Sequence, residues 1–141
     1  MNFIKLRREW VDDDEMLQVE LSASNGALTT TQDFYVYPDE LGEFGKKLQE
    51  FFPTGGQGEV VLEYGSESEN YYSYVKLRTF NINTSSIGIF VRTNNRQEGH
   101  ELAVCEFSIE TTLQSVNELG KRIFSWSRNN EEPLEFSLVS A

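Results

Sequence analysis

An apolar repeat between residues 41 and 51 is the feature that most constrains how this chain can fold. Leu41, Phe44, Leu48 and Phe51 recur at steps of three, four and three, and this spacing places them on one face of an α-helix. Pro38 fits the first turn of such a helix, because an N–H at that position would lack a partner within the helix. The repeat therefore predicts a helix over residues 37–52, whose apolar face has to be covered by other elements.

Segments on both sides of this helix alternate apolar and polar residues, a pattern typical of half-buried β-strands. Asn25-Gly26 lies between two of them and favours a tight antiparallel hairpin. Pro53, Gly55 and Gly56 predict the end of the helix and a flexible connector. The expected strands are residues 3–10, 17–23, 27–36, 59–64, 71–82, 87–92 and 100–109. The tail, residues 131–141, alternates again and is expected either to add a short strand or to pack against the others.

A second helix is expected to begin at Thr111 or Thr112, since Thr111 and Gln114 match a capping box. A glycine inside a helix costs about 1 kcal/mol relative to alanine, so Gly45 and Gly120 indicate a close approach to a sheet or to the other helix. An internal duplication explains the match between the helices, and so does the spacing that any two amphipathic helices on a sheet share. The matched positions are Leu41, Phe44, Gly45, Leu48 and Phe51 in the first helix and Val116, Leu119, Gly120, Ile123 and Trp126 in the second.

Together these elements predict one α+β domain over residues 1–141. We expect an antiparallel sheet of about seven strands packed by two helices, in the order βββα-ββββα. A chain of 141 residues has the usual length of a single domain. No apolar run is long enough to cross a bilayer, and early charges interrupt any secretory signal, so the expected location is cytoplasmic.

Charge and the counts of reactive residues limit the function. The formal net charge is −11, from 23 acidic and 12 basic residues, which argues against non-specific binding to nucleic acid or an anionic membrane and permits a basic partner. Cys105 is the single cysteine, which excludes an internal disulfide. His100 is the single histidine, so the two residues together also exclude the common zinc arrangements. Cys105 alternates with the apolar residues of its strand, which predicts a core side chain rather than a reactive thiol.

The remaining candidate motifs do not indicate catalysis. The run Asp12, Asp13, Asp14 and Glu15 offers carboxylates to a hard cation but lacks the spacing of an EF-hand loop, so a solvated turn is the better interpretation. The glycines after residue 54 are not followed by the Lys-Ser or Lys-Thr of a phosphate-binding loop. Because the sequence also pairs no nucleophile with a base, we expect a non-enzymatic protein without a cofactor or a metal.

The segment from residue 72 to residue 80 interleaves aromatic and basic side chains: Tyr72, Tyr74, Lys76, Arg78 and Phe80. Such a face can stack single-stranded bases, lie under a helix, form cross-strand pairs, or bind a protein, since interfaces favour tyrosine and arginine. The acidic charge disfavours nucleic acid. We therefore expect Tyr72, Tyr74 and Arg78 to hold a protein partner, and Asp12, Asp13 and Asp14 to steer its approach.

Two stretches resemble a family of small bacterial proteins. They are residues 10–26, WVDDDEMLQVELSASNG, and residues 34–52, with a Pro-Asp-Glu-Leu helix start. With the order of elements, they resemble WapI-type immunity proteins of contact-dependent toxin systems. The resemblance implies a protein that neutralises a toxin by binding it, and the acidic charge fits a basic toxin domain. It assigns no binding residue. The alternative is a bacterial or phage domain of unknown role that has a structural function or forms a homodimer.

Overall fold

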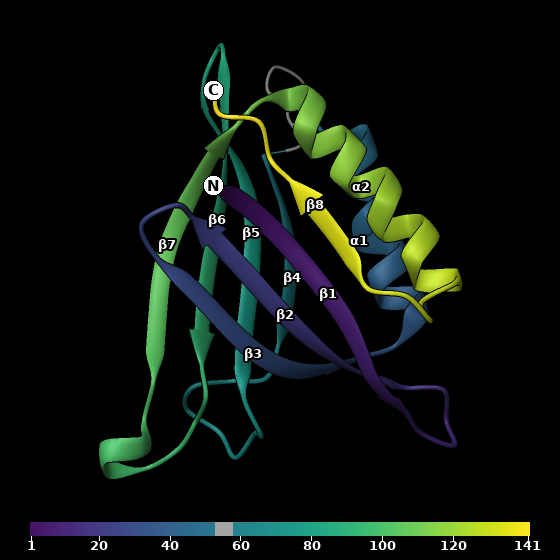
Figure 1. Cartoon of the computed structure of the whole chain (residues 1–141), viewed down its shortest axis with the longest axis vertical. Coiled ribbons are helices and arrows are strands. Elements are labelled where there is room, and N and C mark those ends of the chain that lie inside the picture. The colour runs from purple at the N-terminus through teal and green to yellow at the C-terminus, as the bar shows by residue number, and fades with distance from the viewer. Residues whose placement is uncertain (53–57) are drawn as a thin grey trace.

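The computed structural model describes residues 1–52 and 58–141 (Figure 1). The order of elements confirms both expected helices and a further strand in the tail. It also confirms the seven expected strands, although those expected from residues 71 and 100 start later, at Tyr74 and Val104. The connector predicted at Gly55 and Gly56 lies outside the described residues. The elements are β1 (Asn2–Val11), β2 (Leu17–Asn25), β3 (Thr29–Val36), α1 (Pro38–Glu50), β4 (Glu59–Tyr64), β5 (Tyr74–Asn83), β6 (Ser86–Asn94), η1 (Gly99–Glu101), β7 (Val104–Thr111), α2 (Leu113–Arg128) and β8 (Leu134–Ser137).

The α+β class is confirmed, but the expected single sheet of about seven strands is wrong. The strands form two antiparallel four-stranded sheets, sheet A in the order β3-β2-β1-β8 and sheet B in the order β4-β5-β6-β7. Alternation within a strand shows which side chains are buried, but it does not show which strands are neighbours. Here β4 pairs with β5 and not with β3, so the chain leaves one sheet and starts another after α1.

The two halves of the chain have the same order of elements. In each half three strands joined in sequence are followed by a helix, and the strand after that helix joins the sheet of the other half. Thus β4 pairs with β5, while β8 pairs with β1. The register repeats as well, since Leu6 pairs with Leu134 as Leu77 pairs with Leu62. The repeat seen in the helices therefore extends to the topology of both sheets.

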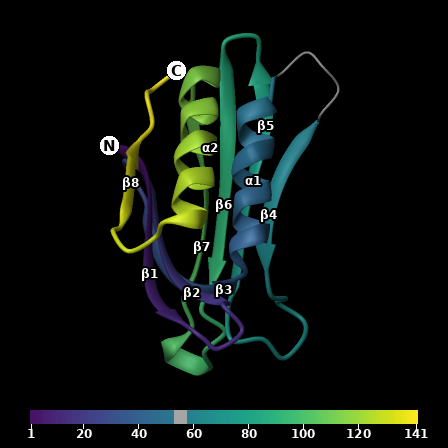
Figure 2. The same cartoon turned by 90° about the vertical axis from the view of Figure 1, so that its right-hand side faces the viewer.

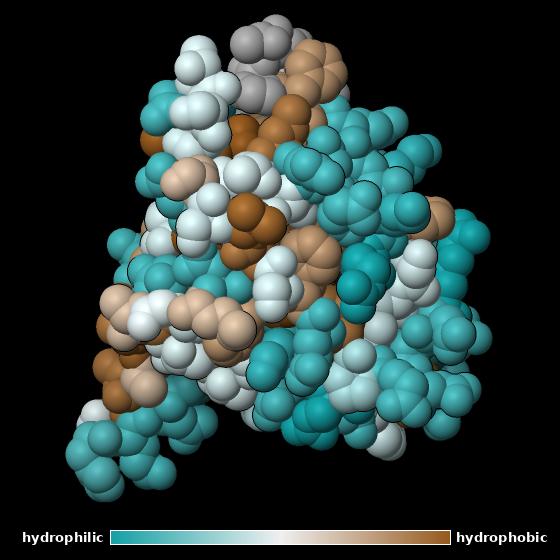
Figure 3. Space-filling model, turned by 45° about the horizontal axis from the view of Figure 1, so that its top comes forward, coloured by the Kyte–Doolittle hydropathy of each residue, from teal (hydrophilic) through white to brown (hydrophobic). Residues whose placement is uncertain are grey.

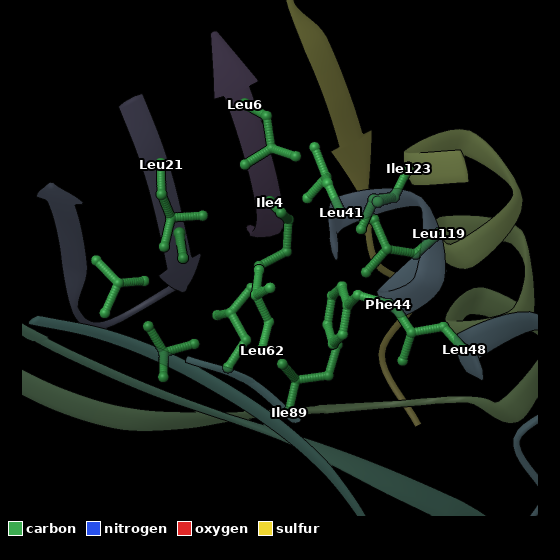
Figure 4. Close-up of a cluster of buried hydrophobic side chains, with 14 of the residues drawn as sticks. Ile4, Leu6, Leu21, Leu41, Phe44, Leu48, Leu62, Ile89, Leu119 and Ile123 are labelled. Atoms are coloured by element: carbon green, nitrogen blue, oxygen red, sulfur yellow. The ribbon is translucent and has the colours of Figure 1, made fainter. Parts of the chain in front are cut away.

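The core lies between the inner faces of the sheets and the helix pair. Strands of sheet A cross those of sheet B diagonally (Figure 1), and the helices lie side by side on the flank between β8 and β4 (Figure 2). Leu6 and Leu21 from sheet A point towards Ile89 from sheet B and Phe44 from α1 (Figure 4). These side chains are at most 4% exposed. Polar residues cover much of the surface on the helix side (Figure 3).

The helices touch at the paired glycines, so of the two expected neighbours, a sheet or the other helix, the close neighbour is the other helix. A Cβ on Gly45 would lie 2.8 Å from the Gly120 carbonyl oxygen, and a Cβ on Gly120 would lie 2.6 Å from that of Gly45. Either glycine therefore admits the other helix at a distance that no side chain allows. Asn117 of α2 donates from its Nδ2 to the Leu48 carbonyl oxygen at 2.8 Å, which satisfies a terminal carbonyl of α1.

The hairpin turns at Gly26-Ala27 rather than at Asn25-Gly26, because the Asn25 amide donates to the Leu28 carbonyl oxygen at 3.1 Å and closes the turn. The Asn25 Oδ1 accepts hydrogen bonds from the amides of Ala27 and Leu28 at 2.9 and 2.8 Å, and β3 starts only at Thr29. Gly26 has φ +94°, which suits glycine. The asparagine side chain thus bonds along the turn, which lies one residue further along the chain than the sequence predicts and sets the register between β2 and β3. No helix within residues 1–52 and 58–141 is long and apolar enough to cross a membrane.

Candidate acidic-aromatic binding patch

The structure separates Tyr72 from the other predicted contact residues. Strand β5 starts at Tyr74, so Tyr72 precedes the strand and does not share a sheet face with Tyr74 and Arg78. Its ring lies 5.6 Å from that of Tyr35 on β3, in an edge-to-face arrangement. The prediction of one continuous face is therefore wrong at this end, because the chain turns towards sheet A before β5 begins.

Tyr74 and Arg78 lie on the outer face of sheet B, where both already have partners. Tyr74 is only 8% exposed, and its hydroxyl donates to the Glu63 carboxylate. Burial makes the largest contribution to raising the pKa of Tyr74, and the hydrogen bond with this carboxylate raises it further. The Arg78 guanidinium pairs with Glu59 and lies over two aromatic rings, 4.8 Å from the centre of Phe80 and 5.0 Å from that of Phe90. These contacts support the interpretation of cross-strand pairs at these positions.

The acidic run at residues 12–15 forms the turn between β1 and β2. Asp12 Oδ1 accepts hydrogen bonds from the amides of Asp14 and Met16, both at 2.9 Å, while Asp13, Asp14 and Glu15 are exposed. This arrangement confirms the predicted turn, since an aspartate that bonds to amides ahead of it favours a chain reversal.

Aromatic side chains gather on the outer face of sheet A next to this turn. The register places Trp10 opposite Gln18, and Gln18 opposite Tyr35, across three neighbouring strands. Tyr72 packs on Tyr35 from outside the sheet. Trp10 is 58% exposed and Tyr72 is 50% exposed. Large aromatic side chains with this exposure are the kind that protein interfaces use as anchors.

Beside Trp10, Tyr35 and Tyr72, three carboxylates from three strands come together. Oxygens of Glu9, Glu20 and Asp33 lie within 4.8 Å of one another. Only Arg7 is paired with this cluster among the described residues, at 3.5 Å from Glu9 and 3.2 Å from Glu20. We call these carboxylates, together with Trp10, Tyr35 and Tyr72, the acidic-aromatic patch.

The carboxylate cluster changes the acidity of Glu9. Its pKa is raised to about 7, first because burial penalises the charged form, and then through a hydrogen bond with Asp33 and repulsion from Asp33 and Glu20. Arg7 acts in the opposite direction but does not cancel these effects. The patch is therefore short of positive charge.

A hydrogen-bonded clamp holds the loop that carries Tyr72. The Glu67 carboxylate accepts from Arg92 Nε and Nη2 at 2.7 and 2.8 Å and from Asn94 Nδ2 at 2.8 Å. The hydrogen bond from Arg92, followed by that from Asn94, lowers the pKa of Glu67. Ser73 Oγ donates to the Asp33 carbonyl oxygen at 2.6 Å and ties the end of the loop to β3. The clamp thus positions Tyr72 beside the carboxylates.

The cluster of Glu9, Glu20 and Asp33 is the single group of metal-ligating side chains found in the described part of the chain, and the Arg7 guanidinium contacts two of its three carboxylates. Cys105 is partly buried against the core, which agrees with a structural side chain. Charge recognition by the patch is the chemistry that these contacts favour.

Comparison with protein-family models, with curated proteins and with solved structures finds no match. The resemblance to immunity proteins therefore stays a prediction.

Proposed function

We propose that this protein is a non-enzymatic binding module that takes a basic protein partner on the acidic-aromatic patch. The excess of carboxylates beside exposed aromatic rings supports this role. Glu9, Glu20 and Asp33 share one arginine, so a lysine or arginine from a partner relieves their repulsion. Trp10 and Tyr72 offer exposed rings next to them, against which the apolar stem or the cationic head of such a side chain packs.

The net charge of −11 adds a long-range contribution. An acidic protein attracts a basic partner before contact, which speeds association more than it slows dissociation. Asp13 and Asp14 are exposed in the turn next to the patch and belong to this steering field. The most specific form of the role is that of an immunity protein, in which the basic partner is a toxin domain that binding neutralises.

Capture of the partner tests the role. The tagged protein is used to retain proteins from extract of the source cell, and the association and dissociation rates of the retained protein are measured at two salt concentrations. We expect a basic protein whose association slows with salt, because the Debye length falls from about 10 Å at 0.1 M to about 3 Å at 1 M. Tyr72→Ala should raise the dissociation rate, and neutralising Asp12, Asp13 and Asp14 together should lower the association rate.

A pair of double variants separates local from overall charge. Glu9→Gln with Glu20→Gln removes two charges from the patch, whereas Glu110→Gln with Glu118→Gln removes two exposed charges elsewhere. Only the first pair should weaken binding strongly. Retention of no protein, or of an acidic protein that binds independently of salt, contradicts the proposed function. Concentration-dependent self-association would instead favour the homodimer.

A further inference from the structure

The two sheets have four edge strands, and side chains bond to the outward backbone of three of them. Strands β7 and β3 accept two such bonds each, and β8 accepts one. By contrast, no hydrogen bond reaches the outer backbone edge of β4 from any residue in 1–52 or 58–141. An unpaired edge of this kind is a template for another strand. The bonds run to carbonyl oxygens, from Asn2 to Glu110, Asn25 to Ser108, Gln32 and Ser73 to Asp33, and Arg122 to Glu135.

The register of sheet B identifies the free groups of β4. Backbone groups of successive residues point to opposite sides of an antiparallel strand. Because the Ser108 carbonyl points outward from β7, the neighbours of Ser108 are the residues that bond to β6. Bonding residues alternate in the same way in β6 and in β5. Following the paired residues from β7 through β6 and β5 to β4 shows that the even-numbered residues of β4 bond to β5. The outward N–H and C=O groups belong to Glu59, Val61 and Glu63.

A cavity of about 270 Å³ lies between this edge and α1. Phe44, Leu62 and Val61 supply its apolar lining, and Val61 is 44% exposed. The charged residues around it are three carboxylates and one amine, from Glu40, Glu43, Glu63 and Lys47. The edge thus offers backbone hydrogen bonds, an apolar contact and an acidic rim to one ligand.

We infer that β4 takes up an extended segment of the basic partner, in which lysine or arginine alternates with apolar residues, as an additional strand of sheet B. This inference rests on the proposed function and names the kind of segment bound. The edge ends at Tyr64, whose ring lies 6.0 Å from that of Tyr35 in the acidic-aromatic patch, so the two surfaces are continuous. A second copy fits less well, because antiparallel pairing centred on Val61 would place Glu59 opposite Glu63, and like charges in that position repel.

A synthetic peptide, Lys-Val-Lys-Val-Lys-Val with blocked ends, tests the edge directly. Its binding to the full chain is followed by NMR, with amide exchange measured at Glu59, Val61 and Glu63. We expect exchange at these amides to slow. Val61→Pro removes one outward N–H and should weaken binding about tenfold, while Val61→Ile keeps the N–H and should bind as the natural protein does. Proline is tolerated at an outward position of an edge strand, and a dispersed spectrum checks that the variant is folded.

A second peptide keeps the test independent of how the variant folds. Methylating the backbone nitrogens of alternate residues preserves charge but removes the donors that a strand needs, so this peptide should not slow exchange along β4. Equal binding of both peptides would overturn strand addition. Perturbation confined to Trp10 and Tyr72 would also overturn it and leave the proposed function standing. If the first peptide adds to β4 while the Glu9 and Glu20 double variant still captures its partner, the patch proposal fails and the edge inference survives. If the protein forms a dimer that Val61→Pro dissociates, the edge of β4 binds a second copy, and the choice of a basic partner is overturned.

Discussion

At the scale of single residues, Glu9 shows how local structure creates a binding property. Strand β1 has an irregularity between Arg8 and Trp10, and such bulges redirect side chains. Glu9 lies there with a side chain that is 25% exposed and close to Asp33 and Glu20. Its raised pKa means that the fold tolerates the ionised form at a cost. This cost is relieved when a cation arrives.

Replacing Glu9 by glutamine should stabilise the protein at high pH only. The folded-state pKa of about 7 lies above the usual value near 4.3, so Glu9 lowers stability progressively as pH rises from about 4 to above 7. Glu9→Gln should therefore raise the melting temperature at pH 8 and leave it unchanged at pH 4. Thermal unfolding at both pH values measures this. An equal shift at both values would show that the charge of Glu9 is not responsible.

At the scale of elements, the helices and the antiparallel pairing of β2 with β3 were predictable, whereas the register of that pair and the division into two sheets were not. A helix is encoded locally, and the stripe from Leu41 to Phe51 is buried as expected. Register depends on turns: a two-residue turn at Asn25-Gly26 would pair Glu20 with Thr31, whereas the turn one residue further along pairs it with Asp33. Because the carboxylate cluster requires that register, the sequence alone could not reveal it. Tyr72 was identified, but its neighbours on sheet A were not.

The contact between the helices makes a prediction about glycine. A Cβ on Gly120 would lie 2.6 Å from the Gly45 carbonyl oxygen, so Gly120→Ala forces the helices apart. We expect a loss of about 1–3 kcal/mol in the free energy of unfolding, despite a gain in helix propensity of about 1 kcal/mol. Urea unfolding measures it.

Gly42→Ala is the matched control on the same helix pair. Its Cβ would lie 3.0 Å from Ser127 Oγ, the end of a side chain, so this variant should be neutral or slightly stabilising. If Gly120→Ala were no more destabilising than Gly42→Ala, the glycine contact would not hold the helices together.

At the scale of the whole molecule, the exchanged strands β4 and β8 join the two halves. Each half contributes the outer strand of the other half's sheet, and the helices meet between them. Sheet B is completed by β4, which follows α1, and sheet A is completed by β8, which follows α2. Loss of one exchanged strand should therefore affect both sheets, and the molecule should unfold as a single cooperative unit.

Equivalent substitutions in the exchanged strands test this coupling. Leu134 of β8 and Leu62 of β4 are 2% and 8% exposed and hold equivalent places in the register. Each change to alanine should cost about 2–5 kcal/mol.

Native-state hydrogen exchange then compares the amides of Val19 in sheet A and Ile89 in sheet B. Because opening of either sheet exposes the shared core, Leu134→Ala should speed exchange at both amides by the same factor, although Leu134 pairs only with sheet A. Faster exchange at Val19 alone would show that the sheets open independently and that the exchanged strands do not couple the halves.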